Sequence, residues 1–503
     1  SAFLAYQPKS TSPWVTGTNF ETAKTFFKTV TSTNSVSAAE VQANVDVVGS
    51  NGSNTAGSDT AFTLTTGVDE PTTTYTKFDG SLTSGGTQTL GSLDKISGTT
   101  GSSDVLNATI KSSVTPASIT GIETVNVVAT AAATLGLANA SGVSKVNAGG
   151  AAGPLTISSL PTTATVTISD TAVDHTLSFK DVDGSSDSVT LAFAQVTGGA
   201  TTEINVAGVE TITATSSGGA ASNSFELEAA ALTTITLDGS GDLTLSSLET
   251  GGTTKLKSVD ASGMTGALDL TTGALSLGTD LTITGGSGND SIDSSGHTGT
   301  AVSIDGGAGN DTVTHVLATD DTIDGGTGTD NIITTAVLTS AGNLSGFETF
   351  TLDVTAGSLN QDFDNLSGNT FTKLVATGDG NTSDDGTFTD IPSTITDFEL
   401  ASTASGDFVL DRKTDTSSDA VTVTLKGDTT TILTANHEEE ITLESSTAAS
   451  TISTLNAADV TKITVTGSAD TFVKTISGND NLATVDASAS TGAVSIGDSA
   501  NAS

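Results

Sequence analysis

Several residue types are scarce or absent in this chain of 503 residues, and each absence excludes a class of structure. Cysteine is absent, which excludes disulfides, thiolate metal sites and cysteine nucleophiles. Only 7 prolines occur, which excludes collagen and proline-rich stalks. Aromatic residues make up 4 % of the chain, so a single large globular core is not expected. No apolar run approaches the roughly 18 residues that a membrane helix needs.

Basic residues are also few: 16 lysines and arginines stand against 57 acidic residues, which gives a net charge of −41. This charge excludes nucleic acid as the main partner, because phosphate binding needs clustered lysine and arginine. It also predicts that self-repulsion keeps the chain largely disordered unless divalent cations are present.

The apolar residues, 35 % of the chain, recur as short runs that alternate with threonine or serine. Val166-Thr-Ile168, Ile235-Thr-Leu237 and Ile463-Thr-Val465 are examples, and glycine, asparagine and aspartate separate such runs. Runs of three to five residues between glycine-rich corners predict a mainly β fold, an elongated multi-turn β-solenoid.

Residues 1–48 differ from the rest of the chain. Capping boxes that begin at Thr18 and Ser37 are each followed by helical spacing of apolar residues. We expect a short helical segment there, the end of an N-terminal domain that this sequence does not contain. Since residue 1 is Ser and the last segment stops abruptly, we expect the sequence to be a piece of a longer protein.

Two acidic elements recur in a fixed order. An aspartate before a β run returns four times, and an apolar-Glu-β element follows each one about twenty residues later. The aspartates are Asp104, Asp187, Asp330 and Asp419, and the glutamates are Glu123, Glu210, Glu348 and Glu440. An active site is normally single, so this recurrence indicates a structural role at corners. Because Val259-Asp-Ala-Ser262 also returns as Val485-Asp-Ala-Ser488, a multi-turn module occurs at least twice.

Three segments match the pattern G-G-x-G-x-D-x-apolar-x, the repeat of the calcium-binding β-roll. They begin with Gly285-Gly-Ser-Gly-Asn-Asp290, Gly306-Gly-Ala-Gly-Asn-Asp311 and Gly325-Gly-Thr-Gly-Thr-Asp330. Glycine permits the positive-φ corner and lets carbonyl oxygens turn inward, while aspartate supplies a hard carboxylate. One such loop has too few oxygens for Ca²⁺, so two loops on neighbouring turns must share an ion.

The motif aspartates are 21 and 19 residues apart, about two nonapeptides each. We therefore expect the three loops to stack on one edge, with two closed calcium sites between them. Asp305 and Asp324 precede glycine pairs and are expected extra ligands, and Asp321 keeps a half-motif on the opposite edge. The predicted metal-binding residues are Gly286, Gly288, Asn289, Asp290, Asp305, Gly307, Gly309, Asn310, Asp311, Asp321, Asp324, Gly326, Gly328 and Asp330.

The glycine-aspartate ladder resembles that of RTX proteins, which Gram-negative bacteria export by type I secretion. Ser103-Asp-Val-Leu-Asn107 followed by Ile119-Thr-Gly-Ile-Glu-Thr-Val-Asn-Val127 resembles RTX-type surface-layer (S-layer) proteins more narrowly. That resemblance implies a calcium-dependent β-solenoid that is secreted and tiles the cell surface as a lattice of identical chains. It also implies export through a C-terminal signal and attachment to lipopolysaccharide through an N-terminal region, neither of which is present in this sequence.

The resulting expectation is a structural S-layer protein, with a calcium-stiffened RTX adhesin as the alternative. We divide the chain into the helical end (1–48), β-solenoid module copies (49–280), the calcium β-roll (281–335) and a second β-solenoid region (336–503). No H-E-x-x-H motif and no G-x-S-x-G elbow before a helix occurs, so we expect no enzyme.

Two secondary features remain. Asp379-Gly-Asn-Thr-Ser-Asp-Asp385 is rich in oxygen and spaced somewhat like a calcium loop, but it lacks the glycine at position six. It is interpreted as a solvated turn or, second, as a weak calcium site. Two ions in the roll neutralise only a small part of the negative charge, so we predict further ions, in such acidic clusters or between chains. His175, His297, His315 and His437 show no metal-ligand spacing, and we expect them at the surface.

Overall fold

The computed structural model describes residues 61–497 except for short gaps at 73–74, 100, 102, 219–222, 250–255, 273–279, 298–300, 338–342, 356, 367–368, 402–403 and 428. The helical segment expected in residues 1–48 lies outside the described residues. The described chain is almost entirely β, with short 3₁₀ turns such as η2 (Gly199–Thr201) and η3 (Phe363–Leu366). Within it, no helix has the length and hydropathy of a membrane span.

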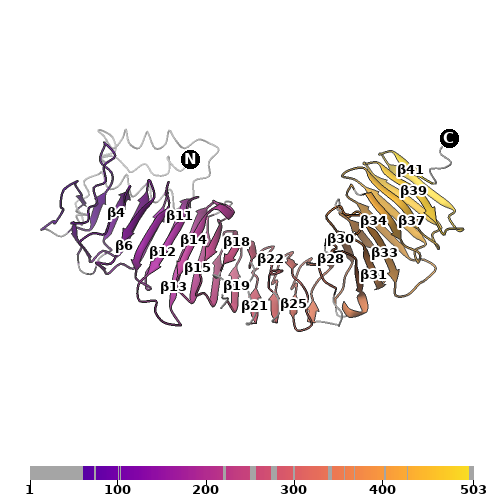
Figure 1. Ribbon diagram of the computed structural model, residues 1–503, viewed down its shortest axis with the longest axis horizontal. Coiled ribbons are helices and arrows are strands. Elements are labelled where there is room, and N and C mark those ends of the chain that lie inside the picture. The colour runs from indigo at the N-terminus through magenta and orange to yellow at the C-terminus, as the bar shows by residue number, and fades with distance from the viewer. Residues whose placement is uncertain are drawn as a thin grey trace, which may run out of the picture.

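The chain winds into a long parallel β-solenoid, as the short alternating runs predict (Figure 1). Successive coils place one strand in each sheet, so strands that alternate along the sequence are neighbours in space. Sheet 1 has 14 strands, in the order β1 (Ala61–Thr63), β2 (Lys77–Gly80), β4 (Val105–Ile110), β6 (Thr124–Ala129), β9 (Lys145–Gly149), β11 (Thr165–Thr171), β13 (Ser188–Val196), β15 (Thr211–Ser217), β17 (Thr234–Gly239), β19 (Ser258–Met264), β21 (Leu281–Thr284), β23 (Val302–Asp305), β25 (Thr322–Asp324) and β27 (Asn343–Ser345).

Sheet 2 continues through both halves of the molecule and is the common wall of the solenoid. Its strands are, in spatial order, β7 (Ala133–Gly136), β10 (Leu155–Leu160), β12 (His175–Phe179), β14 (Glu203–Ala207), β16 (Asn223–Glu228), β18 (Leu243–Glu249), β20 (Leu268–Thr271), β22 (Ser291–Asp293), β24 (Thr312–Thr314), β26 (Asn331–Thr334), β28 (Thr349–Asp353), β30 (Lys373–Thr377), β32 (Asp397–Leu400), β34 (Ala420–Leu425), β36 (Glu440–Ser445), β38 (Lys462–Gly467) and β40 (Thr484–Ser490).

Two smaller sheets complete the described architecture. Sheet 3 replaces sheet 1 as the partner of sheet 2 after β27, and it contains β29 (Leu359–Asp362), β31 (Gly386–Ile391), β33 (Asp407–Arg412), β35 (Thr429–Thr434), β37 (Ser450–Asn456), β39 (Thr471–Ser477) and β41 (Val494–Ile496). Sheet 4, near the N-terminal end of the described chain, contains β3 (Lys95–Ser97), β5 (Ser118–Thr120) and β8 (Ala140–Ser141).

Because neighbouring strands pair in parallel and in register, a side chain on one coil lies beside the equivalent side chain of the next coil. Val166 of β11 lies beside Leu191 of β13, and Ile212 of β15 lies beside Ile235 of β17. These apolar residues point inward and are fully buried, whereas the threonines between them face outward. The alternation of period two therefore explains both the strands and the thin, continuous core.

The repeated Val-Asp-Ala-Ser segment has the same strand geometry in both copies. β19 pairs with β17 through a register shift after Asp260, and β40 pairs with β38 through a register shift after Asp486. Such a shift inserts extra residues on one strand and bends it. The repeat in sequence is thus a repeat of a bulged strand at equivalent places in sheets 1 and 2.

Candidate metal centre

The three glycine-rich loops lie on one edge of the solenoid, where sheet 1 passes into sheet 2. Loop 1 (285–290) joins β21 to β22, loop 2 (306–311) joins β23 to β24, and loop 3 (325–330) joins β25 to β26. Because β21, β23 and β25 are neighbours in one sheet and β22, β24 and β26 in the other, the loops stack on successive coils. This is the arrangement that their spacing predicts.

The motif aspartates form a ladder through the backbone of this edge. Asp311 Oδ1 accepts a hydrogen bond from the N–H of Asp290 at 2.7 Å, and Asp330 Oδ1 accepts one from the N–H of Asp311 at 2.7 Å. One coil earlier, Asp290 Oδ1 accepts a hydrogen bond from the N–H of Leu268 at 2.8 Å. Each aspartate therefore ties its own loop to the preceding coil.

The second carboxylate oxygens of Asp311 and Asp330 are buried and have no hydrogen-bond partner. Both side chains are 1 % exposed. Burial, reinforced by the charges of Asp290, Asp330 and Asp305, raises the pKa of Asp311 to about 6. Burial also raises the pKa of Asp290 and of Asp330. A buried anionic oxygen without a donor is costly, and a hard divalent cation such as Ca²⁺ would compensate it. The donor set therefore fits Ca²⁺.

Glycine is required here because adjacent loops approach closely. Gly307 and Gly326 have φ values of +96° and +91°. A Cβ atom at Gly307 would collide with the carbonyl oxygen of Gly286, and one at Gly328 would collide with the carbonyl oxygen of Gly309. Carbonyl oxygens of one loop thus lie directly against the next loop, and carbonyls are among the oxygen ligands that Ca²⁺ accepts.

Loop 1 differs from the other two loops, although its sequence matches the motif equally well. The glycines at its second and fourth positions do not have the positive φ found in loops 2 and 3. The N–H of Gly286 donates to Asp290 Oδ2 at 2.7 Å, so both oxygens of that aspartate are engaged. In loops 2 and 3 the equivalent N–H donates to Asp305 or Asp324, but Thr284 stands there in loop 1. The pair of loops 2 and 3 therefore has the unpartnered oxygens.

The other predicted ligand side chains make backbone contacts. Asn289 Oδ1 accepts the N–H of Asn310 at 2.8 Å, and Asn310 Oδ1 accepts the N–H of Thr329 at 2.9 Å. Asp305 Oδ1 and Asp324 Oδ1 accept the N–H groups of Gly307 and Gly326, at 3.0 and 3.1 Å. These four side chains order the loops, and one carboxylate oxygen of each aspartate takes no part in that contact.

Asp321, on the opposite edge, belongs to a buried polar group. Its Oδ2 lies 3.0 Å from His315 Nε2 and accepts the N–H of Ala318, while its Oδ1 accepts the N–H of Val302 at 2.9 Å. Both oxygens are therefore engaged within the protein. His175, His297 and His315 are only 1, 3 and 2 % exposed, so the expected surface position was wrong for these three. His175 begins β12, His315 directly follows β24, and His297 lies in the turn after β22.

Each recurring pair of an aspartate and a glutamate joins two neighbouring coils by a hydrogen bond, and we call this contact the latch. Glu123, Glu210 and Glu348 each accept, through Oε2, the backbone N–H of the aspartate that precedes them in the repeat, at 2.8, 2.9 and 2.9 Å. In the last copy the N–H of Asp419 donates to Glu439, not to Glu440. The predicted residue was one position too late. A pattern of Glu-x-apolar, which all four copies share, would have selected Glu439. Glu348 also orders loop 3, because it accepts the N–H of Asp330.

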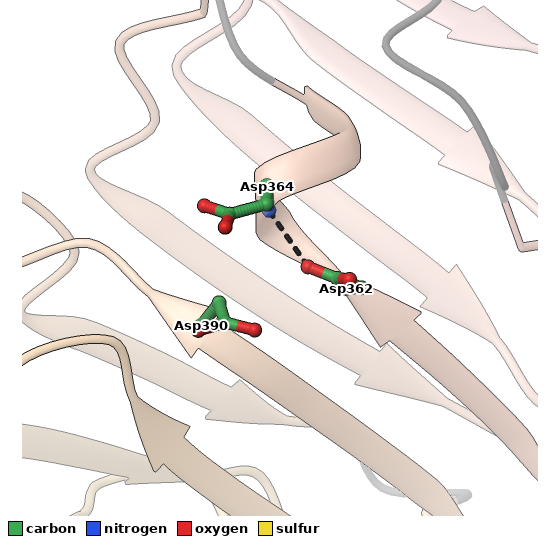
Figure 2. A group of neighbouring side chains, drawn as sticks. All are labelled: Asp362, Asp364 and Asp390. Carbon is green, nitrogen blue, oxygen red and sulfur yellow. Dashed lines mark hydrogen bonds between the residues drawn. The ribbon is translucent and has the colours of Figure 1, made fainter.

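A further acidic group was not found from the sequence. One oxygen from each of Asp362, Asp364 and Asp390 lies within 4.8 Å of the others, and Figure 2 shows the N–H of Asp364 bound to Asp362. Strands β29 and β31 bring these residues together, so no short motif reveals them. Lys413 forms an ion pair with Asp364 and already supplies a positive charge there.

No protein-family model matches this chain, and a comparison with curated proteins finds no relative.

Proposed function

We propose that this chain is a calcium-stabilised structural protein that forms a surface layer on a Gram-negative bacterium, and that it is not an enzyme. The proposal includes secretion by the type I machinery, an extracellular location and attachment to lipopolysaccharide through an N-terminal region. Its principal partner is other copies of the same chain.

The single observation that carries the calcium part is the pair of unpartnered oxygens, Asp311 Oδ2 and Asp330 Oδ2, buried in stacked glycine-rich loops. A bound Ca²⁺ supplies positive charge between coils. Asp311 and Asp330 would hold it from adjacent loops, together with carbonyl oxygens of the glycines. Binding would couple to folding, since the site exists only when the coils are stacked.

The lattice part is supported by the resemblance to RTX-type surface-layer proteins and by the elongated form of the described chain (Figure 1). A net charge of −41 makes such rods repel one another in the absence of cations. Calcium between chains would remove that repulsion and join the rods into a sheet.

The absence of enzymatic function is supported by where the catalytically useful side chains lie. Arg412 is buried and paired with Glu438, at 2.6 Å between Nε and Oε1. Three histidines are buried in the core, and His315 is bound to Asp321. These residues have structural partners and are not exposed to a substrate.

Electron microscopy of metal-stripped protein after addition of Ca²⁺ tests the proposal. Adding about 5–10 mM CaCl₂, above the range of weak extracellular sites, should produce two-dimensional sheets. Addition of the same amount of MgCl₂ controls for ionic strength. Stiffened monomers without sheets would favour the adhesin, and an unchanged chain would contradict both.

A further inference from the structure

A second carboxylate-rich corner follows β30, where sheet 2 passes into sheet 3, whereas the glycine-rich loops precede their strands of sheet 2. The connection between β30 and β31 contains Asp379, Asp384 and Asp385, and Asp407 begins the next strand of sheet 3, β33. The segment is the oxygen-rich turn with calcium-like spacing noted in the sequence.

Asp384 is the unusual residue of this corner. It is 2 % exposed, and its Oδ2 has no hydrogen-bond partner. Burial raises the pKa of Asp384 most. The carboxyl group of Asp379 acts on it directly and also raises its pKa, although a hydrogen bond from the backbone of Asp379 lowers the pKa in part. The charge of Asp385 raises the pKa as well. The charged groups that act on it most are thus acidic, in contrast to Asp364, which is paired with Lys413.

The surrounding groups hold the turn in place but leave Asp384 Oδ2 without a partner. Asp385 uses both oxygens on neighbouring coils: Oδ1 accepts the N–H of Asp407 at 2.9 Å, and Oδ2 accepts the hydroxyl of Ser358 at 2.9 Å. A Cβ atom at Gly406 would collide with the carbonyl of Asp384, so the next coil packs directly on this turn. Asp407 Oδ1 is also buried without a partner.

We propose that this corner binds one divalent cation of the calcium type, with Asp384 Oδ2 and the Asp379 carboxylate as its anionic ligands. Two carboxylates that face each other repel, and a cation between them converts the repulsion into attraction. Since Asp379 is exposed, water completes the oxygen shell on the outer side. Ca²⁺ accepts such a shell in an irregular geometry, whereas Mg²⁺ demands a near-ideal octahedron. The site would give sheet 3 an ion of its own, independent of the glycine-rich loops.

Counting bound ions tests this site. Equilibrium dialysis against radioactive ⁴⁵Ca²⁺ in the millimolar range, about where weak extracellular sites fill, should give one ion fewer per chain for Asp384→Asn than for the parent. Asp480→Asn is the matched control, because Asp480 is an exposed turn residue with the same charge. The control should bind as many ions as the parent.

Two further measurements keep the test decisive. Asp379→Asn changes an exposed residue and should preserve the β circular-dichroism spectrum while weakening the same single site about tenfold. This variant decides the question if Asp384→Asn does not fold. Crystals soaked with Tb³⁺ should show an anomalous peak between Asp379 and Asp384. Unchanged ion counts in both variants, or peaks in the glycine-rich loops with none at this corner, would overturn the proposal and leave the two carboxyl groups sharing a proton.

Discussion

The coils with glycine-rich loops (281–348) and the coils that follow them (349–412) share sheet 2 but have different interiors. In the first group the strands are short: β22, β24 and β25 have three residues each, and Ile292, Val313 and Ile323 are the buried residue of each strand. The corner beside them contains buried carboxylates with unpartnered oxygens. Each of these three strands thus buries a single apolar side chain, and the corner beside them concentrates negative charge.

The following coils are filled with phenylalanine. Phe350 packs on Phe363 and Phe371 with ring centroids 5.6 and 5.7 Å apart, and the stack continues through Phe388 and Phe398. Each such ring buries a large apolar area, and edge-to-face pairs add to it. Arg412, at the end of this region, forms a buried ion pair with Glu438.

This difference indicates that the source of stability changes along one continuous solenoid. Where the core is thick, burial of apolar surface holds the coils together. Where it is thin, we propose that the coils depend on a cation that the protein must obtain from its surroundings. The glycine-rich coils should therefore respond most strongly to calcium and pH. The phenylalanine-filled coils, apart from the corner of Asp379 and Asp384, should respond mainly to changes in core volume.

The largest effect is expected from Phe350→Ala. Truncation of a fully buried ring leaves a cavity and should cost about 3–5 kcal/mol of unfolding free energy, with or without calcium. Phe350→Leu, which keeps most of the volume, should cost much less. Denaturant unfolding of both variants in the two conditions measures this. A loss that disappears when calcium is added would show that the cation, and not the core, stabilises these coils.

The next effect concerns pH in metal-stripped protein. The folded-state pKa of Asp311, about 6, lies above its ordinary value of 3.8, so the folded chain binds more protons between these values than the unfolded chain does. Its contribution is complete below pH 4 and is lost as pH rises through 6, by roughly 2–3 kcal/mol. Thermal melting of the parent and of Asp311→Asn at pH 4.5 and 7.0 measures it. The parent should lose more stability than the variant over this range, and calcium should reverse the trend for the parent. Equal pH dependence in both proteins would contradict the assignment.

Substitution of two glycines distinguishes the effect of close packing from the effect of backbone conformation. Gly328 and Gly478 both have positive φ, at +153° and +75°, but only Gly328 has another backbone where a Cβ atom would stand. Gly478→Ala should cost about 1 kcal/mol for backbone strain alone. Gly328→Ala should cost about 2 kcal/mol more, because the loops must separate, and should weaken calcium binding. Similar losses for both variants, with calcium binding unchanged, would show that the loops are not closely stacked.

The smallest effect tests the latch in the last repeat. Glu439→Ala should cost about 1–2 kcal/mol, because the backbone N–H of Asp419 loses its acceptor. Glu440→Ala should cost less than about 0.5 kcal/mol, because its contact with Lys462 is exposed. Urea midpoints of the two variants distinguish them, and the opposite order would restore the residue chosen from the sequence.

The fold could be predicted because its signal is local. Alternation in segments such as Val166-Thr-Ile168 reports which side chains face inward, and glycine-rich corners mark each turn. The stacking of the three motif loops followed from their spacing alone. The solenoid required no long-range information, since each coil contacts mainly its neighbours.

The details of the sites could not be predicted because they depend on contacts with residues that are not adjacent in the sequence. Asp290 and Asp311 occupy the same motif position but have different contacts. In loop 1, where Thr284 precedes the glycine pair, the N–H of Gly286 donates to Asp290. In loop 2, where Asp305 precedes the glycine pair, the equivalent N–H donates to Asp305. Asp321 matched a half-motif, but its partner His315, directly after β24, is buried beside it. The surface positions predicted for His175, His297 and His315 were wrong for the same reason: spacing between histidines says nothing about the direction of each side chain.

Hydrogen exchange measured by mass spectrometry, on the full chain with calcium and after chelation, tests the central claim most directly. Chelation should remove protection from amides in 281–348, including the N–H groups of Asp290 and Asp311, while amides in 386–412 keep theirs. Calcium added back should restore the protection. Equal protection of both regions with and without calcium would contradict the account, because the thin coils would then need no cation.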